Sequence, residues 1–195
     1  MDSQAQNFIT IVSGLPRSGT SLMMQMLYAG GLPALTDRIR AADSDNPRGY
    51  FEFEQVKQIK KDRAWLADAR GRVVKMVHLL LQDLPLDRQY RVIMMRRDLH
   101  EVIASQTKML QRSGKSGANL SAEQLIKVYE SQLAAVMSWL RERPDHFRVF
   151  ELHYADLIAD PHGQSLRVAK FLESGLDVRA MAAAVDPELY RNRGA

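Results

Sequence analysis

One short segment near the amino terminus combines residues that bind anions. Residues 14–21 read GLPRSGTS, with two glycines five positions apart and a closing Thr-Ser pair. The same glycine spacing occurs in the phosphate-binding loop G-x-x-x-x-G-K-[ST], where backbone amides at a helix N-terminus surround phosphate oxygens. Thr20 stands where that loop has its lysine, and Arg17 supplies a positive charge from inside the loop. A guanidinium offers a fork of donors, so the segment predicts a site for a phosphate and the group attached to it.

A second group of polar residues follows the apolar run at residues 92–95. In nucleoside triphosphatases with such a loop, an acidic residue helps to position magnesium. Here the run ends in Arg96 and Arg97, and Ser105 lies eight residues after Arg97. Cations at this place favour a second phosphate rather than a metal ion. The sequence therefore predicts a ligand with two separated phosphates and no metal site.

Taken in order, the two motifs resemble those of the sulfotransferases that use 3′-phosphoadenosine 5′-phosphosulfate (PAPS). GLPRSGTS is similar to that family's 5′-phosphosulfate loop, and RDLHEVIAS at residues 97–105 is similar to its 3′-phosphate motif. Two weaker similarities, KMVHLLLQDLP at 75–85 and HYADLIADP at 153–161, occur in the family's order. The resemblance spans approximately residues 8–175.

The resemblance implies an enzyme that transfers a sulfonyl group to a hydroxyl or amine, with PAPS as co-substrate and no metal. It implies that Arg17 lies against the bridging oxygen and the sulfonate, where the family has a catalytic lysine, and that Lys75 helps to hold the sulfonate. Arg97 and Ser105 would hold the 3′-phosphate, and the loop would hold the 5′-phosphate. The implied donor-binding residues are Pro16, Arg17, Ser18, Gly19, Thr20, Ser21, Arg97 and Ser105.

The acceptor needs a base to take its proton, and the resemblance offers two candidates. His78 lies three residues after Lys75, whereas the family's cytosolic members have the two residues two apart. In an extended strand this difference puts the side chains on opposite faces. Glu52 follows two aromatic residues, as the base does in tyrosylprotein-type and some bacterial members, and reduced hydration there favours a base at neutral pH. We prefer Glu52, with the alternative that it stabilises a helix beginning near Glu54.

Two other functions fit parts of this pattern. A P-loop small-molecule kinase with an altered lysine would need magnesium and ATP, and a non-catalytic adenine-nucleotide-binding module would keep the pocket without a base. The acceptor, a small molecule or a peptide, would contact loops such as residues 41–49 and 112–119, whose shape no motif encodes. Arg191 or Arg193 would close the 3′-phosphate site in place of the family's distant basic segment, or would belong to a solvated tail.

The elements that must position these residues alternate along the chain. Apolar runs rich in β-branched residues predict strands at residues 8–13, 72–77, 91–96 and 147–152. Capping residues and helical apolar spacing predict helices at residues 20–29, 54–69, 99–111, 121–140, 164–173 and 178–184. This alternation predicts an α/β three-layer sandwich with a mainly parallel central sheet, of the P-loop nucleotide-binding type.

The composition is that of an ordinary globular protein. The 195 residues are 46% hydrophobic and 26% charged, so we expect a single domain over residues 1–195. A net charge of +4 suits a small anionic ligand better than a nucleic acid, which needs clustered basic stripes. No run approaches the ~20 apolar residues of a membrane span, and the first seven residues, MDSQAQN, lack the basic and then apolar profile expected of a secretory signal. With no cysteine in the chain, we expect a cytoplasmic location.

Overall fold

The central element of the fold is one parallel sheet of four strands. The computed structural model describes residues 8–37, 49, 51–112, 114 and 120–186. Within these residues the strand order is β2-β1-β3-β4, and every neighbouring pair is parallel. The strands are β1 (Phe8–Gly14), β2 (Val73–Val77), β3 (Gln89–Arg96) and β4 (Phe147–His153). All four predicted strands are confirmed, with ends that differ by at most two residues.

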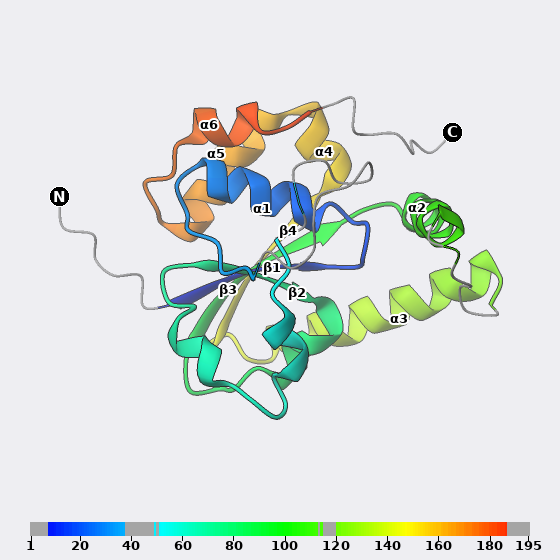
Figure 1. The fold of residues 1–195 in the computed structure, drawn as a ribbon, viewed down its shortest axis with the longest axis horizontal. Helices are drawn as coiled ribbons and strands as arrows, with labels where there is room; N and C mark the ends of the chain where they lie inside the picture. Colours follow the sequence, from blue (N-terminus) through cyan, green and yellow to red (C-terminus); the bar gives the residue numbers. More distant parts are fainter. Residues whose placement is uncertain (1–7, 38–48, 50, 113, 115–119, 187–195) are drawn as a thin grey trace.

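Helices cover both faces of this sheet, which gives the predicted three layers. Side chains alternate along β1, so that Ile9 and Ile11 enter one buried cluster while Phe8 and Val12 enter another. Figure 1 shows the second face covered by α1 (Thr20–Ala29), α4 (Tyr154–Ala159), α5 (Pro161–Leu172) and α6 (Val178–Ala183). The first face is covered by α3 (Ala122–Arg141) and three short 3₁₀ helices. The α/β sandwich with a parallel sheet is therefore confirmed.

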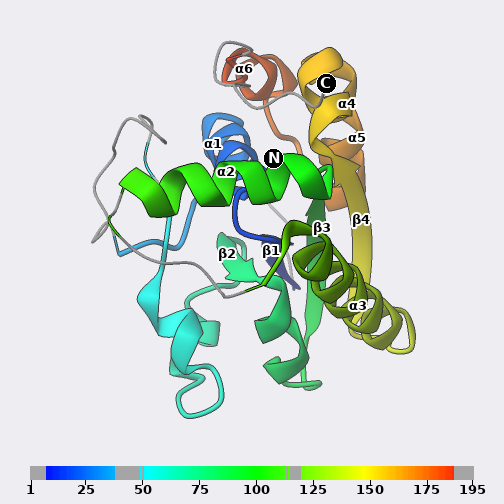
Figure 2. The ribbon, with the colours of Figure 1, turned by 90° about the vertical axis from the view of Figure 1, so that its right-hand side faces the viewer.

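The strand order creates a crevice at the carboxyl end of β1. From β1 the chain passes through α1 to β2 on one side, and from β3 it passes through α2 (Leu99–Arg112) and α3 to β4 on the other. In sheets of this kind, ligands bind outside the carboxyl ends of the strands at the point where the order reverses. Figures 1 and 2 show α2 beyond these strand ends. Both sequence motifs lie at this edge.

The prediction of one continuous helix over residues 54–69 is wrong. The chain instead forms two 3₁₀ helices, η1 (Glu54–Gln58) and η2 (Ala64–Ala67). The amides of Lys61 and Asp62 both donate to the carbonyl of Gln58, and Asp62 Oδ1 accepts from the amide of Ala64 at 2.9 Å. An aspartate that binds the backbone two residues ahead favours a turn over a continuous helix. The expected inner side chains are nevertheless buried, namely Val56, Ile59, Trp65 and Leu66.

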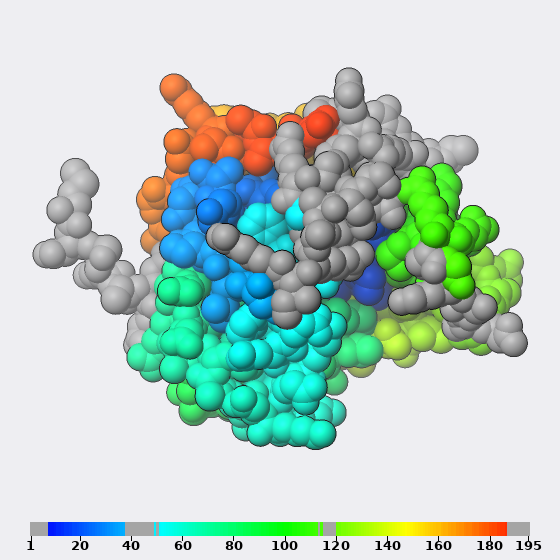
Figure 3. All heavy atoms as spheres, in the orientation of Figure 1, coloured from blue at the N-terminus to red at the C-terminus, as the bar shows by residue number. Residues whose placement is uncertain are grey.

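The segment that carries Glu52 packs beside α1. The rings of Tyr28 and Phe51 lie 5.7 Å apart between centroids. Figure 3 shows the segment that begins at residue 51, in cyan, directly against the blue surface of α1. None of the helices in the described ranges is both long and apolar enough to cross a bilayer.

Candidate active site

The loop between β1 and α1 adopts a conformation that requires glycine at both ends. Gly14 has a φ of +153° and Gly19 a φ of +97°. A Cβ on Gly14 would lie 2.7 Å from the carbonyl oxygen of Met95, and one on Gly19 would lie 2.5 Å from Cδ2 of Tyr154. The backbone of the loop therefore passes closer to its neighbours than any side chain allows, which explains the glycine spacing.

The first turn of α1 supplies backbone donors. Its first hydrogen bond runs from the amide of Met23 to the carbonyl of Gly19, at 3.1 Å. The amides of residues 20–22 therefore have no acceptor within the helix, and they favour an anion at this end. The amide of Ser18 donates to the carbonyl of Leu15 at 3.1 Å and so closes the loop. The Ser18 hydroxyl is buried and has no hydrogen-bond partner in the described part of the chain.

Arg17 joins the loop to the start of α2. Its Nε donates to Ser105 Oγ at 2.9 Å, and its carbonyl accepts from Arg97 Nη1 at 3.1 Å. Arg17 has a φ of +74°, in the left-handed region that non-glycine residues rarely occupy and that is often found at functional sites. The three residues that the sequence assigns to two different phosphates thus form one contact network.

Arg97 is held by contacts on several sides. Its Nε donates to Glu101 Oε2 at 2.8 Å, and the side chains of the pair are only 9% and 8% exposed. Its guanidinium lies 4.6 Å from the ring centroid of Tyr154, within the range of a cation–π contact. The amide of Glu101 donates to Asp98 Oδ1 at 3.1 Å, and the Glu101 carboxylate pairs with Arg97. The guanidinium is therefore fixed in position.

Glu101 and Tyr154 are site residues that the sequence interpretation did not identify. Glu101 lies four residues after Arg97, a spacing that brings side chains together on one helix face, so this contact had a sequence signal. Tyr154 begins α4 after the last strand, and its approach to Gly19 depends on the tertiary fold. Burial raises the pKa of the Tyr154 hydroxyl above its usual value, so this hydroxyl stays protonated at pH 7 beside Arg97.

Two helices support the loop from the other side. Gln106 Nε2, on α2, donates to the carbonyl of Pro16 at 3.0 Å. The hydroxyl of Tyr129, on α3, donates to Gln106 Oε1 at 2.7 Å. The conformation of the loop therefore depends on α2 and α3 as well as on its own glycines.

Lys75 and Glu52 meet on the α1 side of the sheet. Lys75 Nζ donates to Ser21 Oγ at 3.2 Å and lies 3.8 Å from Glu52 Oε1. The carbonyl of Glu52 accepts from Thr36 Oγ1 at 2.8 Å and from the amide of Asp37 at 3.2 Å. The alternative role of Glu52, at the start of a helix, loses its basis because only the five-residue η1 follows. The structure brings the preferred base, the lysine and the loop together.

His78 lies on the opposite face, as its spacing from Lys75 predicts. It begins η3 (His78–Asp83), is buried, and its Nε2 lies 3.2 Å from Gln132 Oε1 on α3. It is not among the described residues that line the cavity discussed below. The structure therefore separates His78 from the Glu52–Lys75 pair.

Acid should reveal the burial of His78. Burial lowers its pKa below the usual 6.5, although the hydrogen bond to Gln132 opposes this. The unfolded chain then binds more protons between the folded pKa and 6.5, so the free energy of unfolding falls as the pH drops through this window. We expect His78→Asn to flatten this fall in urea unfolding measured from pH 7.5 downwards. Replacing the exposed His162 with Asn is the control, and an equal flattening there would contradict the interpretation.

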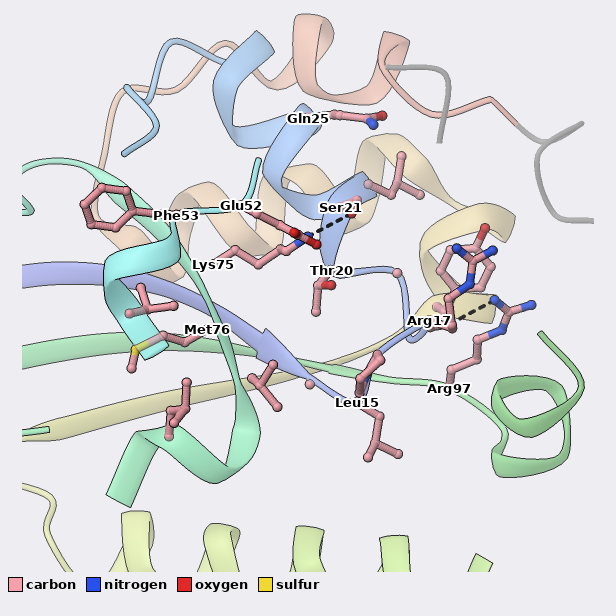
Figure 4. A pocket seen from close by; sticks show the side chains of 18 of the residues that line it. Leu15, Arg17, Thr20, Ser21, Gln25, Glu52, Phe53, Lys75, Met76 and Arg97 are labelled. Atoms are coloured by element: carbon pink, nitrogen blue, oxygen red, sulfur yellow. Dashed lines mark hydrogen bonds and ion pairs between the residues drawn. The ribbon is translucent and has the colours of Figure 1, made fainter. Parts of the chain in front are cut away.

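A cavity of about 450 Å³ contains most of these groups. Figure 4 shows Arg17 and Arg97 at one side of it and Glu52, Lys75 and Ser21 near its middle. The predicted residues among its described lining are Pro16, Arg17, Gly19, Thr20, Ser21, Glu52, Lys75 and Arg97. Ser18 and Ser105 are buried and are not among the described lining residues, and Ser105 accepts a hydrogen bond from Arg17. The described lining holds two guanidiniums and two ammoniums beside three carboxylates, and its arginine side, next to the helix amides, suits an anionic ligand.

Several sequence predictions fall outside the described residues. They are Arg191 and Arg193, and the loops 41–49 and 112–119 except for Gly49, Arg112 and Gly114. Within the described ranges, no three His, Asp or Glu side chains form a group that could hold a metal ion.

Replacing Gly19 with alanine should disrupt the site. A Cβ there adds overpacking against Tyr154 to the cost of a positive φ, so we expect an additional loss of about 1–3 kcal/mol in the free energy of unfolding. Gly31 is a matched control, because its φ is +96° and a Cβ on it would meet nothing within 4 Å. Urea unfolding of Gly19→Ala and Gly31→Ala separates the two costs. Equal losses would show that the contact with Tyr154 is not tight.

Comparisons with known proteins agree with this geometry. The model of the sulfotransferase domain family matches residues 9–187. No curated protein sequence matches the chain. Among solved structures, the sulfotransferase STF1 from Mycobacterium tuberculosis H37Rv is similar with a TM-score of 0.63 and 16% identity, over 92% of this chain and 71% of that one.

Two further solved structures share the fold. The sulfotransferase domain of the olefin synthase from Synechococcus PCC 7002 has a TM-score of 0.56 and 16% identity, over 100% of this chain and 83% of that one. The sulfotransferase domain from the curacin biosynthetic pathway has a TM-score of 0.53 and 18% identity, over 95% of this chain and 86% of that one. At such identities these likenesses establish the P-loop-type fold, while the family model establishes membership. The chain belongs to the sulfotransferase domain family.

Proposed function

We propose that this chain transfers a sulfonyl group from PAPS to a hydroxyl or amine, as one domain over residues 1–195. The observation that carries the proposal is the network in which Arg17 contacts both Ser105 and Arg97. Two cations and a hydroxyl joined in this way, beside the free helix amides of residues 20–22, suit a ligand with two anionic groups better than a single phosphate. PAPS carries its charge in this divided form.

The proposed reaction assigns a task to each group near the loop. The acceptor oxygen or nitrogen forms a bond to sulfur while the bond between sulfur and the bridging oxygen of the 5′-phosphate breaks. The bridging oxygen keeps the electron pair and leaves with adenosine 3′,5′-bisphosphate. Arg17 and the loop amides offset the charge that builds on this leaving group. Lys75, which binds Ser21, would hold the sulfonate beside the base.

Glu52 is the proposed base, and it receives the proton of the acceptor. It lines the cavity and lies 3.8 Å from Lys75 Nζ, whereas His78 is buried against α3 and is not among the described lining residues. A carboxylate at this place can take a proton only from an acceptor that enters the cavity, so the base also helps to orient the acceptor.

Calorimetric titration tests the donor site. Adenosine 3′,5′-bisphosphate should bind with micromolar affinity in the presence of EDTA. Binding of ATP with magnesium, and no binding of the bisphosphate, would overturn the proposal in favour of a kinase.

Transfer of radiolabelled sulfonate tests catalysis. PAPS is incubated with a panel of alcohols, phenols, amines, sugars and peptides, and label is expected in one of these acceptors. Tight binding of the bisphosphate without transfer to any acceptor would instead indicate a non-catalytic nucleotide-binding module.

A further inference from the structure

A short connecting segment, residues 33–37, links β2 to the part of the chain that carries the proposed base. The amide of Leu35 donates to the carbonyl of Val73 at 2.8 Å, and the amide of Val73 donates to the carbonyl of Pro33 at 2.9 Å. These two bonds form a parallel bridge to β2. Because Val73 and Lys75 belong to the same strand, the segment is fixed relative to the lysine.

The far end of this segment holds the backbone on both sides of Phe53. The carbonyl of Glu52 accepts from Thr36 Oγ1 at 2.8 Å and from the amide of Asp37 at 3.2 Å. The Asp37 carboxylate in turn accepts from the amide of Glu54, with Oδ2 at 2.6 Å from the nitrogen. Asp37 therefore binds both the residue of the proposed base and the second residue after it.

The ring that follows Glu52 is anchored as well. The rings of Phe53 and Trp65 lie 5.7 Å apart between centroids and meet edge-on at 76°. Figure 4 shows the Glu52 carboxylate beside Lys75 and the Phe53 ring turned away from this pair. A rotation of the backbone at Glu52 would therefore break this ring contact together with the hydrogen bonds to the connecting segment.

The inference rests on the proposed function, in which Glu52 takes the proton of the acceptor. A base acts only within hydrogen-bond reach of that proton, and a displacement of about 1 Å can slow a reaction about 100-fold. We propose that Asp37, together with Thr36, is a positioning residue for this base. The two residues set the separation of 3.8 Å between Glu52 Oε1 and Lys75 Nζ. Neither is among the described residues that line the cavity, so their effect on the reaction passes through Glu52.

Removing the Asp37 carboxylate should slow turnover without weakening the donor site. We expect Asp37→Ala to lower kcat by about 10- to 100-fold, while the affinity for adenosine 3′,5′-bisphosphate in calorimetry stays within about twofold. Asp37→Asn keeps an oxygen that can accept from the amide of Glu54, so it should recover most of the loss. Transfer is measured with radiolabelled PAPS, the full chain and the panel acceptor that takes the label.

Asp62 offers a matched control. Its Oδ1 accepts from the amide of Ala64, the first residue of η2, just as Asp37 Oδ2 accepts from the amide of Glu54, the first residue of η1. Asp62 is not among the described lining residues of the cavity. We expect Asp62→Ala to keep kcat within about twofold of the wild-type value. Urea unfolding of both alanine variants compares their losses of stability.

A second substitution separates positioning from support of the fold. If Asp37 acts through the Glu52 carboxylate, Asp37→Ala should lower kcat no further in a Glu52→Gln background. A further loss of the same size would show that Asp37 stabilises the whole site, and the inference would be overturned.

The Thr36 hydroxyl gives an independent test, which stands even if Asp37→Ala does not fold. Thr36→Val keeps the shape of the side chain but removes the donor to the Glu52 carbonyl, so kcat should fall by about threefold to tenfold. Thr36→Ser keeps the hydroxyl and should recover this loss. Equal kcat values for the valine variant and the wild type would contradict a role of Thr36 in positioning.

The outcomes separate this inference from the proposed function. If the bisphosphate fails to bind in EDTA, or if no acceptor takes the label, the proposed function falls and the inference falls with it. If Glu52→Gln keeps full turnover, no base at this place needs positioning, and the inference falls while sulfonyl transfer stands. If Glu52→Gln lowers kcat but Asp37→Ala lowers it no more than Asp62→Ala does, the inference alone is overturned.

Discussion

Replacing Arg97 with lysine is expected to weaken binding of adenosine 3′,5′-bisphosphate by about 10- to 100-fold, the cost of lost hydrogen bonds to a charged group. Lysine keeps the positive charge opposite Glu101, so the buried pair remains neutral overall. It lacks the planar fork with which Arg97 binds Glu101 and the Arg17 carbonyl and with which, in the proposed function, it would also contact the 3′-phosphate. Calorimetry measures the loss, and adenosine 5′-monophosphate should lose much less affinity because it has no 3′-phosphate.

A double variant removes the charge without damage to the fold. Removing Arg97 alone would leave the Glu101 carboxylate buried and uncompensated, which is strongly destabilising. Arg97→Gln combined with Glu101→Gln replaces the ion pair with two amides. We expect this variant to fold, to lose the preference for the bisphosphate over the monophosphate, and to retain monophosphate binding. If both ligands lose affinity equally, Arg97 acts by shaping the loop through the Arg17 carbonyl and does not contact the 3′-phosphate.

The loop and the strands could be predicted because their causes are local. The strand pattern follows from burial on both faces of a parallel sheet, and the glycines at positions 14 and 19 follow from positive φ angles and close backbone contacts. The capping pair Ser121 and Gln124 is likewise local, and both of its hydrogen bonds form. Spacing also predicted that Lys75 and His78 reach opposite faces.

The remaining features depend on contacts between distant segments. Apolar spacing over residues 54–69 fits a helix, but η1 ends at Gln58 and the side chain of Asp62 binds the amide of Ala64, where η2 begins. Tyr154 reaches Gly19 and Arg97 only because β4 lies next to β3 and α4 follows it directly. The described lining of the cavity also comes from segments that lie far apart in the chain and that the sheet brings together. No single stretch of sequence contains this information.

Replacing Glu52 with glutamine should lower kcat for sulfonyl transfer by about 10²- to 10⁴-fold, the usual contribution of a general base. The amide has the shape of the carboxylate but cannot take the proton of the acceptor. Binding of adenosine 3′,5′-bisphosphate should change little, because Glu52 lies near the middle of the cavity, apart from Arg17 and Arg97 at one side of it (Figure 4). Steady-state kinetics with radiolabelled PAPS and an alcohol acceptor, together with calorimetry, measure both quantities.

Asp83 provides a matched control for this prediction. Like Glu52, Asp83 is a partly buried carboxylate that pairs with a lysine. The side chain of Asp83 is 20% exposed and that of Glu52 is 28% exposed. Asp83 is not among the described residues that line the cavity. Asp83→Asn removes a lysine–carboxylate pair outside the described lining of the cavity, so its kcat should stay within about twofold of the wild-type value. Its partner Lys60 is 75% exposed whereas Lys75 is 15% exposed, so urea unfolding of both variants is needed to separate a loss of stability from a loss of proton transfer. If Glu52→Gln retains full turnover while His78→Asn abolishes it, the base is His78, and the acceptor must then approach from the α3 side of the sheet.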